Sequence, residues 1–222
     1  MADSIAIDGP VGAGKSSVAQ DVASRLGLVH LDTGAMYRAF AWHALEKGLD
    51  TRDEAALSAL AEGADIRVAF ADGTQRTFVG DADVTDLIRT PRVSLAASDV
   101  SRFADVRAMM VRAQRRIAAE TGMVLDGRDI CTRVLPDAAV KVYLTAAPEI
   151  RARRRYLEML GKGETAVYED VLADVNRRDR QDMTREVEPL RPAEDAVVID
   201  ASDMTQKQAA DAIIALWEAK RS

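Results

Sequence analysis

The sequence is poor in the side chains that build disulfides and metal centres. Its 222 residues include one cysteine, Cys131, and two histidines, His30 and His43. A lone cysteine excludes an internal disulfide and fits a reducing compartment. Neither histidine has a partner at metal-ligand spacing, so we interpret both as structural residues. The chain also shows no Ser-His-Asp or Cys-His set, which argues against nucleophilic hydrolysis as its chemistry.

Long apolar runs and excess positive charge are missing too. No stretch approaches the ~20 apolar residues that cross a bilayer, and the chain starts with acids rather than with a basic segment and an apolar run. We therefore expect no membrane contact, no secretory signal and a cytoplasmic location. The formal net charge of −6 argues against nucleic-acid binding. Arginines are nevertheless clustered at 112–116, 151–155 and 177–185. Such clusters indicate a small, phosphate-rich ligand, unless they only decorate helix surfaces.

What the chain does contain is a glycine-rich loop near its start. Residues 8–17 fit the pattern G-x-x-x-x-G-K-[ST], between a short apolar strand and an apolar stripe at helical spacing. The backbone N–H groups of such a loop bind nucleotide phosphates at a helix N-terminus. A glycine-rich turn without a ligand is disfavoured by this context. The residues expected to bind the nucleotide are Gly9, Pro10, Val11, Gly12, Ala13, Gly14, Lys15, Ser16 and Ser17. Lys15 would reach the β- and γ-phosphates, and Ser16 would ligate Mg²⁺.

Strands and helices alternate along most of the chain. Apolar strands are predicted at 4–8, 28–31, 123–126, 139–144 and 196–199, and helical segments separate them. This order predicts an α/β fold with a parallel sheet that is covered on both faces. Residues 64–88 instead alternate in the manner of antiparallel strands, and we expect a small inserted sheet there. It would serve as a substrate-covering lobe, or it is a decorative excursion.

Two later helices carry charge where a buried face is expected. Residues 148–160 hold four arginines within five positions, which suits a mobile cover over phosphates. In the helix at 166–186, the apolar face of Val171 and Val175 continues onto Arg178, Asp182 and Arg185. Charges on a core-facing side need partners. The partners are either one another or a shared anionic ligand, and we favour the ligand.

These parts are those of a small phosphoryl-transfer enzyme. Phosphoryl transfer requires an in-line arrangement and positive charge around the γ-phosphoryl group. A switch GTPase would need a base-reading motif, and we find no N-K-x-D element. Tyr37 and Arg38, in the first turn of a helix after a strand, are candidate phosphate contacts. Arg107 lies one position off the apolar stripe of its helix, so it can point across the packing seam.

The chain resembles the cytidylate (CMP) kinases of bacteria, nearly from end to end. The resemblance is carried by Ile7–Ser16, Leu31–Arg38 with the sequence LDTGAMYR, Asp126–Ile130 with the sequence DGRDI, and the group Arg178, Asp179, Asp182 and Arg185. The first motif is shared by many kinases, whereas the second and third together are specific to this family. The resemblance implies ATP-dependent phosphorylation of CMP and dCMP with Mg²⁺, by a monomer that acts on nucleotides.

The resemblance also implies an architecture and a set of site residues. The single kinase domain would comprise a five-stranded P-loop core at about 1–32, 122–147 and 188–222, a monophosphate-binding lobe at about 33–121 and an arginine-rich lid at about 148–187. Cytosine would be read by Ser98, Arg107 and Asp129. Arg38 and Arg128 would hold the acceptor phosphate, near Tyr37. Sugar and phosphates would be served by Thr33, Arg178, Asp182 and Arg185, and the lid arginines are Arg151, Arg154 and Arg155. The catalytic set is Lys15, Arg128, Arg178, Asp182 and Arg185.

Several points stay open at the level of sequence. Cys131 occupies a position where the family commonly has glycine, so the backbone after Asp129 could be shifted, although a lone thiol is more typical of packing than of reactivity. Asp8 and Asp126 both end strands beside the loop, and either could hold a metal-bound water. A broader UMP/CMP kinase is the alternative within enzymes. A nucleotide-dependent regulatory binder without turnover is the alternative outside them.

Overall fold

A five-stranded parallel sheet forms the centre of the molecule. The computed structural model describes residues 3–71 and 73–221. The strands are β1 (Ile5–Asp8), β2 (Val29–Asp32), β6 (Met123–Gly127), β7 (Val140–Thr145) and β8 (Val197–Asp200). They lie side by side in the order β2-β6-β1-β7-β8, so the strand before the glycine-rich loop is central. All neighbouring pairs are parallel, which confirms the predicted sheet.

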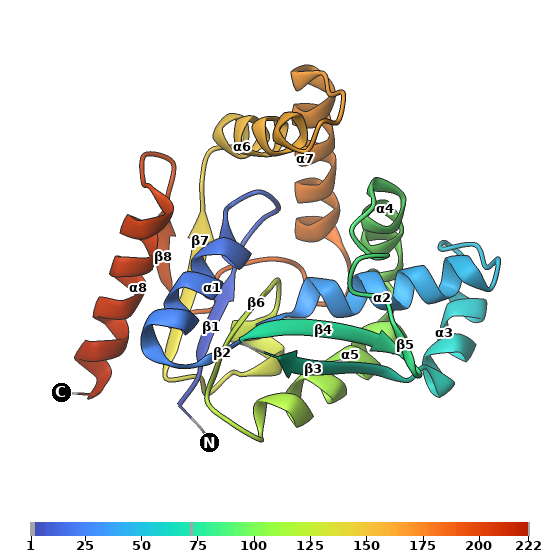
Figure 1. The fold of residues 1–222 in the computed structure, drawn as a ribbon, viewed down its shortest axis with the longest axis horizontal. Helices are drawn as coiled ribbons and strands as arrows, with labels where there is room; N and C mark the ends of the chain where they lie inside the picture. Colours follow the sequence, from blue (N-terminus) through green and yellow to red (C-terminus); the bar gives the residue numbers. More distant parts are fainter. Residues whose placement is uncertain (1–2, 72, 222) are drawn as a thin grey trace.

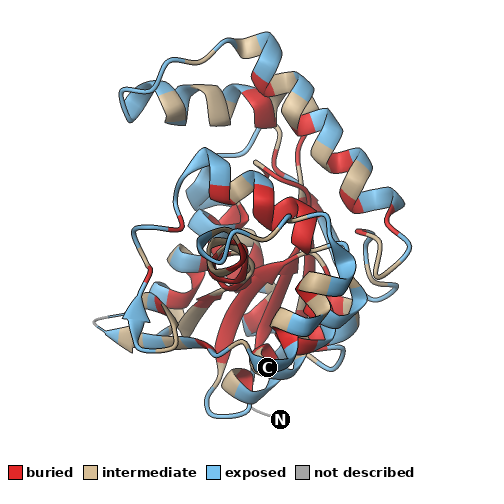
Figure 2. Cartoon of the chain, turned by 90° about the vertical axis from the view of Figure 1, so that its right-hand side faces the viewer, coloured by how far each residue is buried: buried red, intermediate tan, exposed pale blue. Residues whose placement is uncertain are grey.

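Helices cover both faces of this sheet, as Figure 1 shows. On one face, α1 (Lys15–Leu26) and α8 (Gln206–Arg221) pack over Ile5 and Ile7. On the other face, α2 (Thr33–Glu46) and α5 (Ala104–Ala118) pack over Ala6. Because successive side chains of a strand point to opposite faces, one strand supplies both cores. The buried strands occupy the middle of the molecule in Figure 2.

The predicted insertion at 64–88 is a small antiparallel sheet. It consists of β3 (Ile66–Ala71), β4 (Thr74–Val79) and β5 (Ala82–Asp83), in that order. Helices α3 (Glu54–Gly63) and α4 (Pro91–Val100) flank it in the sequence. Its apolar residues Ile66, Val68 and Phe70 belong to the same core as α2 and α5. The insertion therefore packs against the α/β body of the molecule rather than standing apart from it.

A pair of helices lies over the carboxyl ends of the central strands (Figure 1). Helices α6 (Pro148–Gly161) and α7 (Tyr168–Thr184) pack on each other. Their separate cluster of buried apolar residues is small: Val11, Ala152, Val171 and Val175. Among the helices that the structure describes, none is long and apolar enough to cross a membrane.

Three elements escaped the prediction. Helix α4 begins at Pro91 after the capping Thr90, whose hydroxyl accepts a hydrogen bond from the Val93 N–H, a start signal that the sequence does contain. Helix α8 buries five residues at helical spacing, namely Ala209, Ala210, Ile213, Ile214 and Trp217. The third element is a single π-helical turn, η1 (Ile130–Val134), directly after Asp129. No local pattern announces a π-turn, and such turns are frequent at functional sites.

Candidate active site

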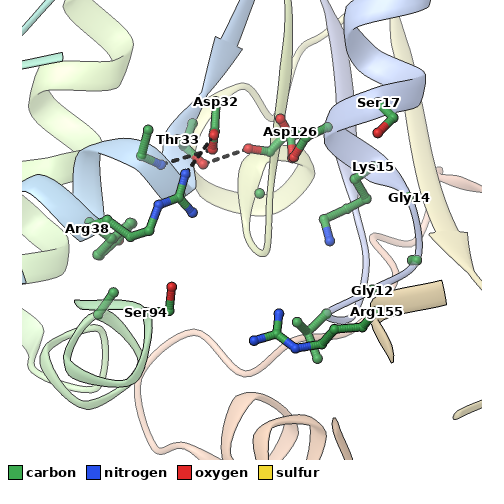
Figure 3. A pocket seen from close by; sticks show the side chains of 18 of the residues that line it. Gly12, Gly14, Lys15, Ser17, Asp32, Thr33, Arg38, Ser94, Asp126 and Arg155 are labelled. Carbon is green, nitrogen blue, oxygen red and sulfur yellow. Dashed lines mark hydrogen bonds and ion pairs between the residues drawn. The ribbon is translucent and has the colours of Figure 1, made fainter. Parts of the chain in front are cut away.

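One large cavity opens where β1, β2 and β6 end. It has a volume of about 940 Å³ and receives side chains from the glycine-rich loop, from α2, α4, α5 and the insertion, and from α6 and α7. Figure 3 shows Lys15 and Arg155 on one side of the cavity and Arg38 and Ser94 on the other. In open α/β sheets, ligands bind in this crevice at the carboxyl ends of the strands. The volume and the two opposed sets of cations suit two phosphorylated ligands rather than one.

Three glycines of the loop have backbone conformations, or contacts with neighbouring backbone, that a larger residue would not tolerate. Gly9 has φ +151°, and a Cβ added there would lie 2.0 Å from the Leu144 carbonyl oxygen. Gly12 has φ +75°, and Gly14, which precedes α1, has φ +90°. Such positive φ values favour glycine. Residues 11–17 line the cavity, whereas Gly9 and Pro10 do not. Gly9 and Pro10 therefore shape the loop from behind, and the Pro10 carbonyl accepts a hydrogen bond from Lys15 Nζ at 2.8 Å.

Several positively charged side chains line the cavity near one another. Burial lowers the pKa of Lys15 to about 7, and the neighbouring Arg128 guanidinium adds to this effect. Burial, together with Arg128 and Arg155, lowers the pKa of Arg178 to about 10. The attraction of Asp174 and Asp182 for the Arg178 guanidinium offsets this lowering only in part. Because neighbouring cations lower the pKa values of Lys15 and Arg178, the binding of a polyanion among them is energetically favourable.

The carboxyl end of β6 brings a carboxylate to the hydroxyl of Ser16. Asp126 Oδ2 accepts a hydrogen bond from Ser16 Oγ at 2.8 Å, and Asp126 Oδ1 lies 2.7 Å from His30 Nε2. Asp8, the other open candidate beside the loop, has no such access. It is 1% exposed, does not line the cavity, and accepts from the Ile130 and Cys131 N–H groups at 2.9 and 2.8 Å. Asp126 is thus the acid that faces Ser16.

The π-turn shows how Cys131 is accommodated after Asp129. Its N–H binds Asp8, and its thiol lies 3.5 Å from the Ala6 carbonyl oxygen in the core. Burial raises the pKa of the Cys131 thiol, so the thiol is a packing group.

Elsewhere in the lining of the cavity, α5 and the segment between β6 and η1 place an arginine against an acid. Arg107 and Asp129 form a buried ion pair, and Arg107 Nη1 also donates to the Ser101 carbonyl oxygen at 3.1 Å. The Arg107 guanidinium lies 5.8 Å from the centre of the Tyr37 ring. Ser98, in α4, also lines the cavity and is 7% exposed. Arg107 and Asp129 thus offer hydrogen-bond donors and an acceptor side by side.

Polar atoms without a partner gather near this ion pair. In the part of the chain that the structure describes, four buried side-chain atoms have none, and three are Tyr37 Oη, Arg107 Nε and Arg185 Nη2. Buried polar groups are nearly always hydrogen-bonded in native proteins, so a group of orphans needs an explanation. A polar ligand between Tyr37, Arg107 and Arg185 supplies one.

The acceptor side of the cavity is built on the start of α2. Asp32 caps this helix, because its Oδ1 accepts from the Ala35 N–H at 2.9 Å, and its Oδ2 binds Arg38 Nη2 at 2.8 Å. Thr33 Oγ1 donates to the Asp126 carbonyl oxygen at 2.6 Å. Opposite α2, Arg128 Nε donates to Asp182 Oδ2 at 2.8 Å. This pair belongs to the internal network that we weighed against a shared ligand for the α7 charges.

The position of Arg151 corrects one expectation. It does not line the cavity, and its guanidinium is 3% exposed and engaged by the protein. It binds both carboxylate oxygens of Asp179, at 3.0 and 2.6 Å, and donates to the Val11 carbonyl oxygen at 3.0 Å. Arg151 is therefore a brace between α6, α7 and the loop, not a lid residue that meets phosphates. Arg154 and Arg155, one turn further along α6, do line the cavity.

The remaining predicted residues meet in this one cavity. Those brought together in its lining are Val11, Gly12, Ala13, Gly14, Lys15, Ser16, Ser17, Thr33, Tyr37, Arg38, Ser98, Arg107, Arg128, Asp129, Arg154, Arg155, Arg178, Asp182 and Arg185. Residues that we did not predict also line it, among them His30, Gln75 and Ser94. His30 was interpreted as structural, and only the parallel pairing of β2 with β6 brings it to Asp126.

The chain is similar to known proteins over nearly its whole length. Residues 5–219 match the model of the cytidylate kinase family. The chain belongs to the cytidylate kinase family. It is therefore a nucleotide kinase, and the resemblance seen in the motifs is confirmed. Its phosphoryl donor is ATP.

Relatives match over nearly the whole length. The cytidylate kinase of Bacillus subtilis is 44% identical over 217 residues, which are 98% of this chain and 97% of the relative. That of Caldicellulosiruptor bescii is 44% identical over 213 residues, 96% of this chain and 94% of the relative. A solved structure of an uncharacterized protein from Eubacterium ventriosum has a TM-score of 0.56 at 13% identity and covers 99% of both chains. This last likeness shows the fold alone.

Proposed function

We propose that the enzyme transfers the γ-phosphoryl group of ATP directly to CMP and dCMP, in line, and that Mg²⁺ takes part. The proposal rests on one observation: the phosphate-binding loop and the Arg107–Asp129 pair line one and the same cavity. A donor triphosphate on the loop and an acceptor base at Arg107 would point their phosphates at each other, across Lys15, Arg128 and Arg178. In-line transfer needs this arrangement and this positive charge.

The donor end fits a magnesium ion. Ser16 and Asp126 present a hydroxyl and a carboxylate that already lie 2.8 Å apart. Mg²⁺ is commonly held by one or two protein oxygens together with substrate phosphates, so a larger cluster of acids is not required. When bound beside Ser16 and Asp126, Mg²⁺ would neutralise charge that develops on the transferring group in the transition state. The chain itself contributes the loop N–H groups and Lys15, which would orient the triphosphate, and Arg154 and Arg155, which would cover it.

The acceptor end fits cytosine better than the other bases. The exocyclic N4 amine of cytosine is a donor, which suits the Asp129 carboxylate, while the O2 and N3 acceptors suit Arg107 and the Ser98 hydroxyl. Uracil has a carbonyl where cytosine has the amine, so it would place an acceptor against Asp129. The orphaned Arg107 Nε and Tyr37 Oη lie at this end and would gain partners from a bound nucleotide.

The phosphate and sugar of the acceptor would lie between α2 and α7. Arg38 binds Asp32 through Nη2 and can offer its other N–H groups to a phosphate, while Arg128 can release Asp182 and turn to a phosphate. Arg178 and Arg185 would meet the transferring group and the acceptor phosphate. Asp182 and Thr33 would meet hydroxyl groups or orient the arginines. Charge-assisted bonds of this kind are the strong ones in phosphate recognition.

The test is turnover of CMP, dCMP, UMP and AMP with ATP and Mg²⁺ by the purified enzyme. We expect CMP and dCMP to be preferred, and a preference for AMP would refute the proposal. Asp129→Asn should lower kcat/KM for CMP by about 10- to 100-fold, the value of one good hydrogen-bonded base contact, and should leave the affinity for ATP unchanged. Asp99→Asn is the matched control, because Asp99 is buried in α4 but does not line the cavity.

The wider organisation is part of the same proposal. We propose one kinase domain in three parts: a core, a monophosphate-binding lobe at about 33–121 and a lid at about 148–187. The small apolar cluster under α6 and α7 supports a separate lid. A monomer is supported because one chain supplies both ends of the cavity. A cytoplasmic location is supported by the nucleotide substrates and by a single, buried cysteine thiol.

A further inference from the structure

One side chain of the inserted sheet reaches the edge of the parallel sheet. Gln75, in β4, forms two hydrogen bonds with the backbone of Asp32, at the end of β2. The Asp32 N–H donates to Gln75 Oε1 at 2.7 Å, and Gln75 Nε2 donates to the Asp32 carbonyl oxygen at 3.2 Å. The insertion is thereby tied to the strand end from which α2 starts.

The Gln75 amide makes the same pair of hydrogen bonds to Asp32 that the backbone of a neighbouring strand would make. β2 is an outer strand of the sheet, with β6 on one side only. The N–H and the C=O of one residue in a strand point to the same side, so an outer strand presents such pairs to whatever lies beside it. The Gln75 amide has the same donor and acceptor as a peptide group and binds both groups of Asp32. A single side chain thus completes the edge of the sheet at this residue.

The orientation of the amide is fixed from the insertion side. The second proton of Gln75 Nε2 is directed at Thr77 Oγ1, 3.2 Å away. Thr77 is 1% exposed, and its N–H donates to Thr85 Oγ1 at 2.9 Å. Turning the amide over would place its oxygen against the Asp32 carbonyl oxygen, so only one orientation satisfies all three hydrogen bonds.

The contact between Gln75 and Asp32 lies in the cavity lining itself. Asp32 caps α2 through the Ala35 N–H and holds Arg38 Nη2 at 2.8 Å, and Gln75 itself lines the cavity. Whatever fixes the backbone of Asp32 fixes the carboxylate to which Arg38 is bound. We propose that Gln75 is a positioning residue for acceptor binding, which acts through Asp32 on Arg38. This inference rests on the proposed function, in which Arg38 holds the acceptor phosphate, and it gives the inserted sheet a part in that binding.

The first test replaces the amide without shortening the side chain. Gln75→Met keeps the length and removes all three hydrogen bonds. We expect KM for CMP to rise about tenfold, as the loss of a small number of hydrogen bonds predicts, with KM for ATP within about twofold of the wild type. Gln75→Ala should act in the same direction. Arg76→Met is the matched control: Arg76 is the next residue of β4, and its exposed side chain binds Asp83 within the insertion at 3.2 Å. It should leave both KM values unchanged.

The second test asks whether Gln75 works through Arg38. In an Arg38→Met background, Gln75→Met should change KM for CMP by less than about twofold, because residues that act in series are not additive. An equal effect in both backgrounds would overturn the proposed route, and so would equal rises in KM for CMP and ATP, or no rise at all. If the wild type turns over CMP while Gln75→Met matches it, only this inference fails. A wild type without CMP turnover would overturn the proposed function and this inference together.

Discussion

The brace formed by Arg151 makes a sharp prediction about stability. Arg151 is 3% exposed, and four of its hydrogen bonds go to the Asp179 carboxylate and to the carbonyl oxygens of Val11 and Ala146. Arg151→Met removes these bonds and leaves the Asp179 charge buried without its partner. Breaking a buried pair in this way costs about 3–5 kcal/mol. In a chain of this size that lowers the midpoint of thermal unfolding by about 10 °C.

The assay is thermal unfolding combined with ATP kinetics. Because Arg151 holds the loop carbonyl of Val11, we also expect KM for ATP to rise while KM for CMP stays unchanged. In a double-mutant cycle with Asp179→Asn, the two single changes should together cost more than the double change, by about 1–3 kcal/mol. Arg153→Met serves as the control, because Arg153 is exposed on the same helix.

One result would refute this reasoning. If Arg151→Met unfolds within about 2 °C of the wild type, a shift worth no more than about 1 kcal/mol, the guanidinium does not brace α6 and α7. If it also loses ATP affinity to the extent that Arg155→Met does, Arg151 contacts the ligand, as the arginine cluster at 151–155 first led us to expect.

Three further predictions follow from backbone and charge. Gly9→Ala should abolish nucleotide binding or prevent folding, because its Cβ would meet the Leu144 carbonyl oxygen at 2.0 Å. Gly163→Ala, with φ +76° but open space around it, should fold with a loss of about 1–2 kcal/mol in the free energy of unfolding. Unfolding curves of the two variants distinguish these outcomes, and equal losses would contradict the clash at Gly9. Lys15, with its pKa lowered to about 7, should take up a proton when ATP binds at pH 8, so binding enthalpies should differ between buffers of different ionisation enthalpy; equal enthalpies would argue against it. Burial raises the pKa of Asp8 to about 6 from 3.8, so its contribution to stability is complete below about pH 4 and is lost as the pH rises to about 6. The free energy of unfolding of the wild type, relative to Asp8→Asn, should fall by about 3 kcal/mol over that interval, and parallel pH profiles would contradict this.

Much of the fold could be predicted because its signals are local. Each strand of the central sheet is a short apolar run, and the alternation with helices fixes a parallel sheet. The insertion was predicted because the spacing of apolar residues changes from helical to alternating at 64–88. The π-turn after Asp129 has no such signal, because it depends on the Asp8 carboxylate, which binds two of its N–H groups from a strand more than a hundred residues away in the sequence.

The site divides in the same way. Lys15 and Ser16 follow from a fixed pattern, whereas Arg107 was assigned to the site by the family resemblance, and its place beside an apolar stripe predicted only that it points across the packing seam. The arginines at 151–155 could not be sorted by sequence. A helix advances 3.6 residues per turn, so neighbouring arginines point in different directions, and only the packing of α6 on α7 decides which one is buried. The roles of His30 and Gln75 depend on strand pairing and on the docking of the insertion, and neither is visible in the order of residues.

The small cluster under the lid has an energetic consequence. Val11 is part of the phosphate-binding loop, yet it packs with Ala152, Val171 and Val175 of the two lid helices. The loop therefore serves as part of the floor on which the lid is built. If α6 and α7 close as the proposed lid, a nucleotide that orders the loop would order this cluster as well, and the lid would then lose less conformational entropy on closing. Under the proposed function, the packing of Val11 would thus link donor binding to lid closure, in addition to the contacts that Arg154 and Arg155 would make with the triphosphate.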